Sequence, residues 1–394
     1  MSVTKNMDAH TIHLSLAMLS AGFWVPAGIW LMSKRHAFTV LASVPIQDED
    51  ALPAVSVVIP ARNEERNLEH ALQSVLDLDY PDIEIIVVND RSTDTTGAIL
   101  ARTLERDARL AVVTIDDLPA GWIGKPYALH TGAQRARGEF ILFTDADIVF
   151  RPSALRKAVA HAQANGFDHV TLIPESTMPG NFLTTVSATF GMFMFIIFKP
   201  WKARDPQSRR YVGVGAFNLI RTSAYRAMGG HQPVALRPDD DLKFGKLVKD
   251  NGYRQDVLNG RGMVTVEWYR SVAELIDGLM KNMFAGMGYN VSLVIAATLA
   301  ALVMHIWPWI GVWVTDGWTQ ACYVVTVVMM VGSFGVVMAP FGVKFRDGLL
   351  LPFTIGLLVY IQCRAAALAL WRGGIVWRGT FYELRQLKTG SRSG

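Results

Sequence analysis

Two aspartates, Asp145 and Asp147, stand in the middle of the otherwise apolar stretch FILFTDADIVF. A buried carboxylate without a partner is costly, so we expect the strand to end just before Asp145. A lone Asp-x-Asp pair is often only a solvated turn. Two carboxylates one residue apart at a strand end can, however, reach one cation, and Mg²⁺ and Mn²⁺ prefer oxygen ligands. The pair therefore predicts a divalent-metal site that bridges these acids to a diphosphate.

Two other loops carry polar side chains that could contact a nucleoside. Asp90 lies in the stretch NDRSTD at the end of an apolar run, where it could accept a hydrogen bond from a nucleobase, whereas Asp94 can simply cap the next helix. Glu64, in the stretch PARNEE, fits either a helix start or a contact to a base or ribose. We therefore expect Asp90 to face a ligand and leave both interpretations of Glu64 open.

Three consecutive acids, Asp239, Asp240 and Asp241, are candidates for proton transfer. Adjacent carboxylates repel one another, so partial burial should raise the pKa of at least one of them. A carboxylate with a raised pKa suits a general base. An acid-rich helix start is the alternative. Both interpretations hold if Asp241 caps the helix while Asp239 or Asp240 faces a cleft.

The segments that must position these acids alternate between strand and helix. Strands are predicted at residues 55–59, 83–88, 111–114 and 140–143, and helices at 64–76, 94–105 and 127–136. This alternation is typical of an α/β fold, with a mostly parallel sheet and helices on both faces. Ligands bind beyond the carboxyl ends of the strands in such sheets, so the loops with the acids should share one edge.

The composition indicates a membrane protein more than a nucleic-acid-binding one. The 394 residues are 51% hydrophobic and only 18% charged, with a net charge of +4. This is more apolar than is usual for a soluble domain. Because no dense Lys/Arg tract is interleaved with aromatic residues, we expect no nucleic-acid partner. The two cysteines lie in apolar runs and are expected to be packed thiols.

Four apolar runs are long enough to meet a bilayer, at residues 11–32, 291–314, 320–341 and 348–363. The basic cluster SKRH follows the first run, which favours an uncleaved anchor over a signal peptide. The basic residues predict that the central region faces the cytoplasm, in our interpretation at a bacterial inner membrane. The fourth run is short for a span and Arg364 follows it, so a span and a segment that bends back both remain open.

A further uncharged run, at residues 182–198, lies between the acids of the central region. A span there would separate Asp147 from the three consecutive acids, so we expect a buried or interfacial helix. Residues 275–287 have the same character. The predicted domains are an N-terminal transmembrane anchor (1–36), a catalytic domain (50–270), an interfacial helix (271–290), C-terminal transmembrane segments (291–371) and a basic tail (372–394).

The order of these motifs resembles that of the family 2 inverting glycosyltransferases, which have the GT-A fold. The resemblance covers residues 54–270 and rests on the stretches VSVVIPARNEERNLEHALQSVL, IEIIVVNDRSTDTTGAIL, GKPYALHTGAQRARGEFILFTDAD and PDDDLKFGKLVKDNGYR. Two further stretches, LPAGWIGKPYAL and WRGTFY, together with apolar runs on both sides, look like membrane glycosyltransferases that act on lipids, such as the hopene-associated and carotenoid-type ones. The resemblance therefore implies a nucleotide-sugar donor, a lipid acceptor and a membrane setting.

The resemblance also implies a role for each candidate residue. The residues that would line the nucleoside pocket are Pro60, Arg62, Glu64 and Asp90. Lys125 would approach the base or the diphosphate. Asp145 would touch the nucleotide-sugar and, together with Asp147, hold Mg²⁺ or Mn²⁺ as the cofactor. Asp239 would be the catalytic base, with Asp240 as the close alternative.

Two departures from the family pattern bear on function. Pro238 stands where a Glu is common, which leaves the register of the acids open, and the Gln-x-x-Arg-Trp motif of processive members is absent. We therefore expect an enzyme that transfers a single sugar, a hexose by preference, to an isoprenoid, hopanoid or similar lipid with inversion. The alternatives are a processive polysaccharide synthase and, from another class, a membrane transporter or channel with a nucleotide-binding regulatory domain.

Overall fold

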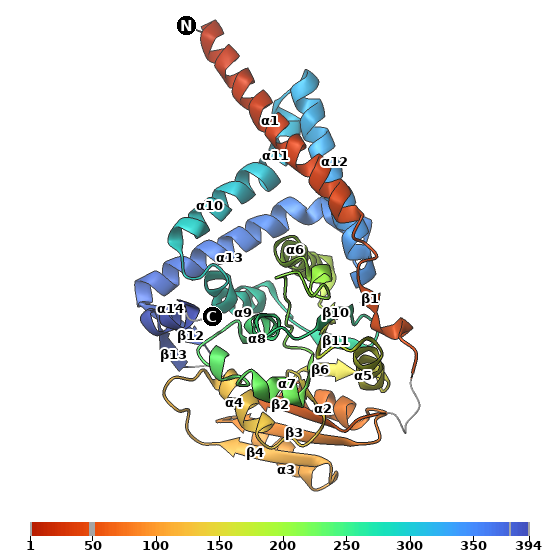
Figure 1. The fold of residues 1–394 in the computed structure, drawn as a ribbon. Coiled ribbons are helices and arrows are strands. Elements are labelled where there is room, and N and C mark those ends of the chain that lie inside the picture. Colours follow the sequence, from red (N-terminus) through yellow and green to blue (C-terminus); the bar gives the residue numbers. More distant parts are fainter. Residues whose placement is uncertain (1, 47–51, 378–379, 393–394) are drawn as a thin grey trace. The chain divides into compact units, whose positions relative to one another are not determined.

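The computed structural model describes residues 2–46, 52–377 and 380–392 (Figure 1). The chain forms two compact units. The first, which we call the sheet unit, comprises Phe38–Thr177, Phe198–Trp268 and Arg385–Gly394. The second, which we call the helical unit, comprises Met1–Ala37, Met178–Ile197 and Tyr269–Leu384. In sequence, the segment Met178–Ile197 of the helical unit thus lies between two segments of the sheet unit.

An eight-stranded sheet forms the centre of the sheet unit in the described residues, with the order β1-β10-β7-β9-β5-β2-β3-β4. Its strands are Thr39–Val40 (β1), Val55–Ala61 (β2), Ile83–Asp90 (β3), Leu110–Ile115 (β4), Phe140–Phe143 (β5), His169–Ile173 (β7), Asn218–Arg221 (β9) and Gln255–Asn259 (β10). Neighbours run parallel except that β9 is antiparallel to both β5 and β7. The prediction of a mostly parallel sheet built on these first strands is confirmed.

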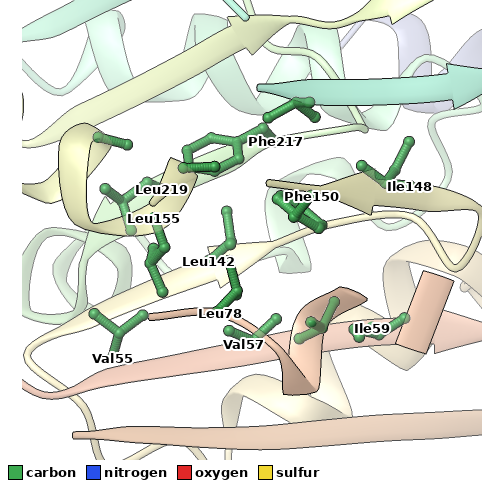
Figure 2. Packing of buried hydrophobic residues seen from close by; sticks show 14 of the residues in the cluster. Val55, Val57, Ile59, Leu78, Leu142, Ile148, Phe150, Leu155, Phe217 and Leu219 are labelled. Atoms are coloured by element: carbon green, nitrogen blue, oxygen red, sulfur yellow. The ribbon is translucent and has the colours of Figure 1, made fainter. Parts of the chain in front are cut away.

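Helices cover both faces of this sheet, as the sequence predicts. The helices on one face are α2 (Leu68–Leu76), α3 (Thr96–Leu104) and α5 (Ala154–Asn165), and those on the other are α4 (Gly124–Ala133), α7 (Thr222–Ala227) and α8 (Asp240–Asp250). Successive residues of a strand point to opposite faces. Val57 accordingly packs in the first cluster and Val58 in the second. Figure 2 shows the first cluster, in which Val57 and Ile59 lie along one side of β2.

The predicted helix at 64–76 begins later than its apolar spacing indicates. It begins at Leu68, because the residues before it belong to a loop held by hydrogen bonds. Asn63 has a φ of 54°, and the Glu64 N–H donates to Thr96 Oγ1 at 2.8 Å. The interpretation of Glu64 as a residue of the helix start is therefore wrong. Asp94 accepts a hydrogen bond from the Thr96 N–H at 3.0 Å, at the first residue of α3, but the N-cap residue of this helix is Thr95.

A three-stranded sheet of β6 (Ile148–Phe150), β8 (Glu175–Thr177) and β11 (Val264–Glu267) also belongs to the sheet unit. β6 begins directly after Asp147 and runs antiparallel to β11. Its residues Ile148 and Phe150 join the first buried cluster (Figure 2). The chain therefore leaves β5 after Phe143, as expected, and both acids of the Asp-x-Asp pair lie in the turn that leads into β6.

Five helices of the described chain are long and apolar enough to cross a membrane. They are His10–Met32, Gly180–Lys202, Val291–Val314, Gly317–Phe341 and Phe345–Arg372. The first, third and fourth match apolar runs in the sequence. The last contains α13 (Leu351–Arg372), which continues through Arg364. The helix is therefore longer than the uncharged part of the fourth run, and its length suffices for the span that the sequence left open.

Polar side chains join the helices of the helical unit. Besides α13, this unit includes α1 (Ser2–Met32), α6 (Gly180–Phe198), α9 (Val272–Ala285) and α10 (Val291–Ala301). Trp24 of α1 donates to the carbonyl of Met304, in the π-helical turn Leu302–Ile306 that follows α10, at 2.9 Å. Thr189 of α6 shares a buried hydrogen bond of 2.9 Å with Thr354 of α13. Such contacts are the usual polar links between apolar helices, and they fix α6 and α1 within this unit.

His169 lies on β7 in the middle of the large sheet and is fully buried. Burial lowers its pKa to about 4, although a hydrogen bond with Asn218 acts in the opposite direction. The unfolded chain binds the proton near pH 6.5 and the folded chain only near pH 4, so stability is lost as the pH falls through this window.

We expect this residue to lower the free energy of unfolding by about 3 kcal/mol between pH 7 and pH 4. Denaturant unfolding at a series of pH values measures it, with His169→Gln as the variant that removes the titrating group. The variant should show a shallower decline of stability with acid. Identical pH dependence in both proteins would contradict the prediction.

Candidate active site

The acids found in the sequence converge at one edge of the large sheet. β2, β3 and β5 are parallel, and β2 lies between the other two, so their carboxyl ends meet there. α4 begins beside them. A Cβ atom on Gly124 would lie 2.5 Å from Asp90 Oδ2, and the Nζ of Lys125 lies 2.5 Å from Asp145 Oδ1. The structure thus brings Asp90, Lys125 and Asp145 together, as the sequence predicts for this edge.

Asp90 is buried at the last position of β3, with 3% of its surface exposed. Arg91 donates to both of its oxygens, from Nε at 2.7 Å and from Nη2 at 3.1 Å. Arg62 Nη1 lies 3.8 Å from Asp90 Oδ2. Pro60 is buried within β2, two residues before Arg62. The two guanidinium groups hold Asp90 as an oriented carboxylate, with further acceptor capacity for a ligand N–H.

The loops after β2 and β3 are tied to each other by their own side chains. Asn63 Oδ1 accepts a hydrogen bond from the Thr93 N–H at 2.8 Å, and Glu65 Oε2 accepts one from the Thr95 N–H at 3.0 Å. These hydrogen bonds hold Asn63 and Glu65, and so they fix the position of Glu64, which lies between these two residues. The negative charge of Glu64 acts on Asp147, so the loop after β2 reaches the Asp-x-Asp turn.

The Asp-x-Asp turn carries more negative charge than its single lysine balances. Burial raises the pKa of Asp147 to about 7, and Asp145 and Glu64 add to the rise while Lys125 opposes it. Burial alone would lower the pKa of Lys125, but Asp145, Asp240 and Asp241 together hold it above its ordinary value. Lys125 is therefore a permanent cation beside a cluster of acids.

This donor set suits a hard divalent cation. Asp145 and Asp147 offer carboxylate oxygens from a single turn, and Mg²⁺ commonly uses one or two carboxylates together with substrate phosphates. In the described residues, no group of three or more His, Cys, Asp or Glu side chains is arranged to hold a metal ion by itself. The two carboxylates of this turn fit an ion that takes further ligands from a bound diphosphate.

Asp241 faces this cluster through the backbone of Gly215. The Gly215 N–H donates to Asp241 Oδ2 at 2.9 Å, and the Gly215 carbonyl accepts from the Asp145 N–H at 3.1 Å. Burial raises the pKa of Asp241, and Asp145 adds to the rise, whereas Lys125 and the backbone hydrogen bonds oppose it. One glycine thus links an acid of α8 to the acid that follows β5.

The other two acids of the series have different surroundings. Both oxygens of Asp239 accept hydrogen bonds from Arg237, at 2.9 Å from Nε and 2.8 Å from Nη2. Asp240 is buried, with 3% exposed, and lines a small cavity together with His231, Lys125 and Asp241. Asp239 stands at the N-cap position of α8. The arrangement in which Asp241 caps the helix is therefore wrong.

The sequence reasoning missed the parts played by Asp241 and Gly215. Three adjacent residues at a helix start point about 100° apart, so they cannot all face a given site, and the acids themselves do not say which do. The choice is made by Arg237, which binds Asp239, and by Gly215, which lies in a separate segment. The closely spaced glycines of YVGVGAF were the available signal, because glycines often mark close approaches of the backbone.

Replacing Gly215 by alanine should disrupt the site. A Cβ atom at this position would lie 2.6 Å from Asp145 Oδ2, 2.9 Å from Lys125 Nζ and 3.3 Å from Asp241 Oδ2. These groups would have to move apart by a fraction of an ångström or more, and such misplacement can cost about 100-fold in rate. Steady-state turnover of a nucleotide-sugar by the purified full-length protein measures the effect.

Gly97→Ala is the matched control for Gly215→Ala. Gly97 lies in α3, and its nearest atom to an added Cβ is Asn89 Nδ2 at 3.5 Å, an ordinary contact. This variant should keep the wild-type rate and gain slight stability, because alanine favours a helix more than glycine does. Equal activity of the two alanine variants would contradict a tightly packed site around Gly215.

Comparison with known proteins bears on the family and the fold of the chain. Residues 56–229 match the family described as Glycosyl transferase family 2. The chain is 27% identical over 237 residues to the 4,4'-diaponeurosporenoate glycosyltransferase of Staphylococcus aureus strain USA300, covering 60% of this chain and 62% of that protein. It is 26% identical over 246 residues to the protein of the same name from strain MRSA252, covering 62% and 64%. The chain thus spans a little under two thirds of the length of these relatives.

A solved structure supports the fold. The mannosyltransferase PcManGT from Pyrobaculum calidifontis, in complex with GDP-Man and Mn²⁺, superposes with a TM-score of 0.52 at 17% identity, over 91% of this chain and 99% of that one. At this identity the likeness concerns the fold alone, and it confirms the GT-A architecture expected from the sequence. Residues 56–229 are therefore similar to a family 2 glycosyltransferase domain, and the sheet has the GT-A fold.

Proposed function

We propose that this protein is a membrane-bound glycosyltransferase that moves one sugar from a nucleotide-sugar donor to a lipid acceptor with inversion. The observation that carries the proposal is the link through Gly215, which joins Asp241 to Asp145 within reach of Lys125. A base, together with positive charge from a lysine and from a metal ion held by acids, suits single-displacement sugar transfer.

The donor would bind across the carboxyl ends of β2, β3 and β5. Pro60, Arg62 and Asp90 would contact the nucleoside, because Asp90 is a fixed acceptor beside two guanidinium groups. Glu64 would lie between the nucleoside and the acids of the turn. Lys125 would neutralise the growing charge of the departing nucleoside diphosphate.

The divalent cation would be held by Asp145 and Asp147. When bound, Mg²⁺ or Mn²⁺ would supply positive charge to the leaving diphosphate. A related structure of the same fold contains Mn²⁺ and GDP-Man, which is consistent with this choice. Lys125 already contacts Asp145 and would share the same phosphate group from the protein side.

The base would be Asp241 more readily than Asp239 or Asp240. Both oxygens of Asp239 are already occupied by hydrogen bonds from Arg237, so neither is turned toward an acceptor hydroxyl. Asp241 keeps a raised pKa and lies close to the acids of the turn. It would take the proton from the acceptor hydroxyl as that oxygen attacks the anomeric carbon from the face opposite the diphosphate.

The acceptor would be a lipid, because the catalytic domain is joined to apolar helices and its relatives are named for a carotenoid-type substrate. Trp313, Trp318 and Trp371 are more than four-fifths exposed near the ends of apolar helices, where tryptophan suits a membrane interface. We propose a multi-pass protein of a bacterial inner membrane with its sheet unit in the cytoplasm.

The helix α6 would not cross the bilayer in this arrangement. It follows β8 and precedes β9, which are both strands of the sheet unit, so both of its ends continue into the same unit. A single crossing would place these ends on opposite sides of the membrane. α6 would therefore lie in the interface or enter the bilayer from one side, although its length and composition suffice for a span.

Membranes containing the full chain, incubated with a panel of nucleotide-sugars, test the proposal. Mass spectrometry of the lipid extract should show one lipid whose mass has risen by a single sugar residue. A ladder of masses would indicate a processive synthase instead. Unchanged lipids and intact donors across the panel would overturn the glycosyltransferase function and favour a regulatory nucleotide-binding role.

A further inference from the structure

We infer that Gln255 is a positioning residue for catalysis, which holds Gly215 and Asp241 in register. This inference rests on the proposed function. Gln255 lies on β10, is fully buried and touches none of the groups that would contact a donor. It acts through the backbone of the segment 212–215 and through α8.

The segment 212–215 and α8 approach each other backbone to backbone. A Cβ atom on Gly213 would collide with the carbonyl of Asp241, and a Cβ atom on Gly245 would collide with the carbonyl of Val212. Only glycine permits this approach at either position. The first turns of α8 are therefore fixed to the segment that carries Gly215, and any shift between them would change the distance from Asp241 to Asp145.

The side-chain amide of Gln255 closes this contact. Its Oε1 accepts a hydrogen bond from the Val212 N–H at 3.0 Å, and its Nε2 donates to the Gly245 carbonyl at 3.2 Å. A backbone N–H can only meet the oxygen and a backbone carbonyl can only meet the nitrogen, so these two contacts fix the orientation of the amide. One side chain thus joins both sides of the glycine contact.

The same amide also fixes the tautomer of His169. Gln255 Nε2 is a donor, so His169 Nδ1, which lies 2.9 Å away, must accept, and its Nε2–H donates to Asn218 Oδ1 at 3.1 Å. Asn218 Nδ2 in turn donates to the Val214 carbonyl at 2.9 Å. A chain of three buried polar side chains therefore holds the segment at two alternate residues, Val212 and Val214.

Thr171 completes the support. Its Oγ1 accepts a hydrogen bond from the Val214 N–H at 3.1 Å. With Val212 and Val214 held in this way, Gly213 and Gly215 remain to face α8 and the acids. Buried polar groups are costly unless they are satisfied, and an apolar filling would stabilise this part of the sheet more simply. The network is better explained by the backbone geometry that it imposes next to Asp145 and Asp241.

The test compares two neighbouring residues of β10 that point to opposite faces of the sheet. Gln255→Leu removes every hydrogen bond of the amide while roughly keeping its volume. Asp256→Asn is the matched control, because Asp256 is equally buried but contacts His161 and Arg204 instead. For each detergent-purified full-length protein, the melting temperature, kcat for donor turnover and the dissociation constant for the nucleoside diphosphate are measured.

We expect Gln255→Leu to lower kcat by about 100-fold and to change the dissociation constant by less than about twofold, because Asp90 and Arg62 come from other strands. Asp256→Asn should lower the melting temperature without a comparable loss of kcat. Gln255→Glu, which keeps an acceptor for Val212 but turns an oxygen toward the Gly245 carbonyl, should also lower kcat. It also replaces Gln255→Leu should that variant fail to fold.

The outcomes separate the inference from the function on which it rests. Wild-type protein that turns over no nucleotide-sugar overturns the proposed function. Active wild-type protein with a normal kcat in both Gln255 variants overturns the positioning role, as does a loss of kcat that only follows the melting temperature and is shared by Asp256→Asn. A specific loss of kcat with intact nucleotide binding supports it.

Discussion

Replacing Asp147 by asparagine should lower the release of nucleoside diphosphate from a nucleotide-sugar by about 10³-fold. Burial in the turn between β5 and β6 raises the pKa of Asp147, and the negative charges of Asp145 and Glu64 add to the rise. A cation would relieve this repulsion. An amide oxygen carries no net charge and is a poorer ligand for Mg²⁺ or Mn²⁺. The variant should also require more Mn²⁺ for half-maximal rate, which a Mn²⁺ titration of initial rates would show.

Asp82→Asn is the control for Asp147→Asn. Asp82 is an exposed acid just before β3, at the opposite end of the strand from Asp90, and its loss removes the same charge from the same unit. It should leave the rate and the Mn²⁺ requirement unchanged. Wild-type turnover by Asp147→Asn at all Mn²⁺ concentrations would exclude the metal role of the Asp-x-Asp pair.

The edge of the sheet that holds these acids could be predicted from the sequence because its signals are local. An apolar run that meets Asp145 cannot continue as a buried strand, so the end of β5 could be predicted from the sequence. Strand-helix alternation implies a parallel sheet, which brings the ends of β2, β3 and β5 to one edge. These arguments use only short stretches of sequence and the fixed geometry of parallel strands.

Other features depend on contacts between distant segments. β9 runs antiparallel between β5 and β7, and nothing within its four residues indicates that placement. The buried polar side chains of His169 and Gln255 look like exceptions to an apolar strand until the segment 212–215 is in place. α6 is an apolar helix that the chain contributes to the helical unit from within the sheet unit, and its composition alone resembles a span.

The choice among the three consecutive acids was also beyond the sequence. Their resemblance to the family segment favoured Asp239, but the residue two positions earlier, Arg237, binds both of its oxygens. The partner of Asp241, Gly215, lies 26 residues earlier in the chain. The choice between Asp239 and Asp241, two positions apart, therefore depends on contacts that only the folded chain creates.

Asp241→Asn should lower the rate of sugar transfer by about 10²- to 10⁴-fold, the range found when a general base is removed. Donor binding should remain, because the nucleoside side of the site comes from β2 and β3. Transfer to the lipid and binding of the nucleoside diphosphate, measured on the same preparation, separate these effects. Asp240→Asn is expected to have an intermediate effect, since Asp240 is buried beside Lys125 and acts on its pKa.

Asp239→Asn tests the assignment that the family resemblance favours. It should weaken the contact with Arg237 and cost stability of about 1 kcal/mol or more, but it should lower the rate of transfer far less than Asp241→Asn does. The reverse order of effects would mean that Arg237 releases Asp239 when the acceptor binds. The base would then be Asp239, and the surroundings of Asp241 would serve the geometry of the site.

A second substitution at Asp241 distinguishes a base from a structural anchor. The side chain also accepts a hydrogen bond from the Gly215 N–H, and asparagine keeps an oxygen for this contact while it loses the capacity to take a proton. Alanine loses both. Asparagine can therefore support Gly215 but cannot act as the base. Equal loss of transfer in Asp241→Asn and Asp241→Ala would assign the base to Asp241. Near-normal transfer in Asp241→Asn with inactive Asp241→Ala would make it an anchor for Gly215, and the proton would have to leave through one of its neighbours.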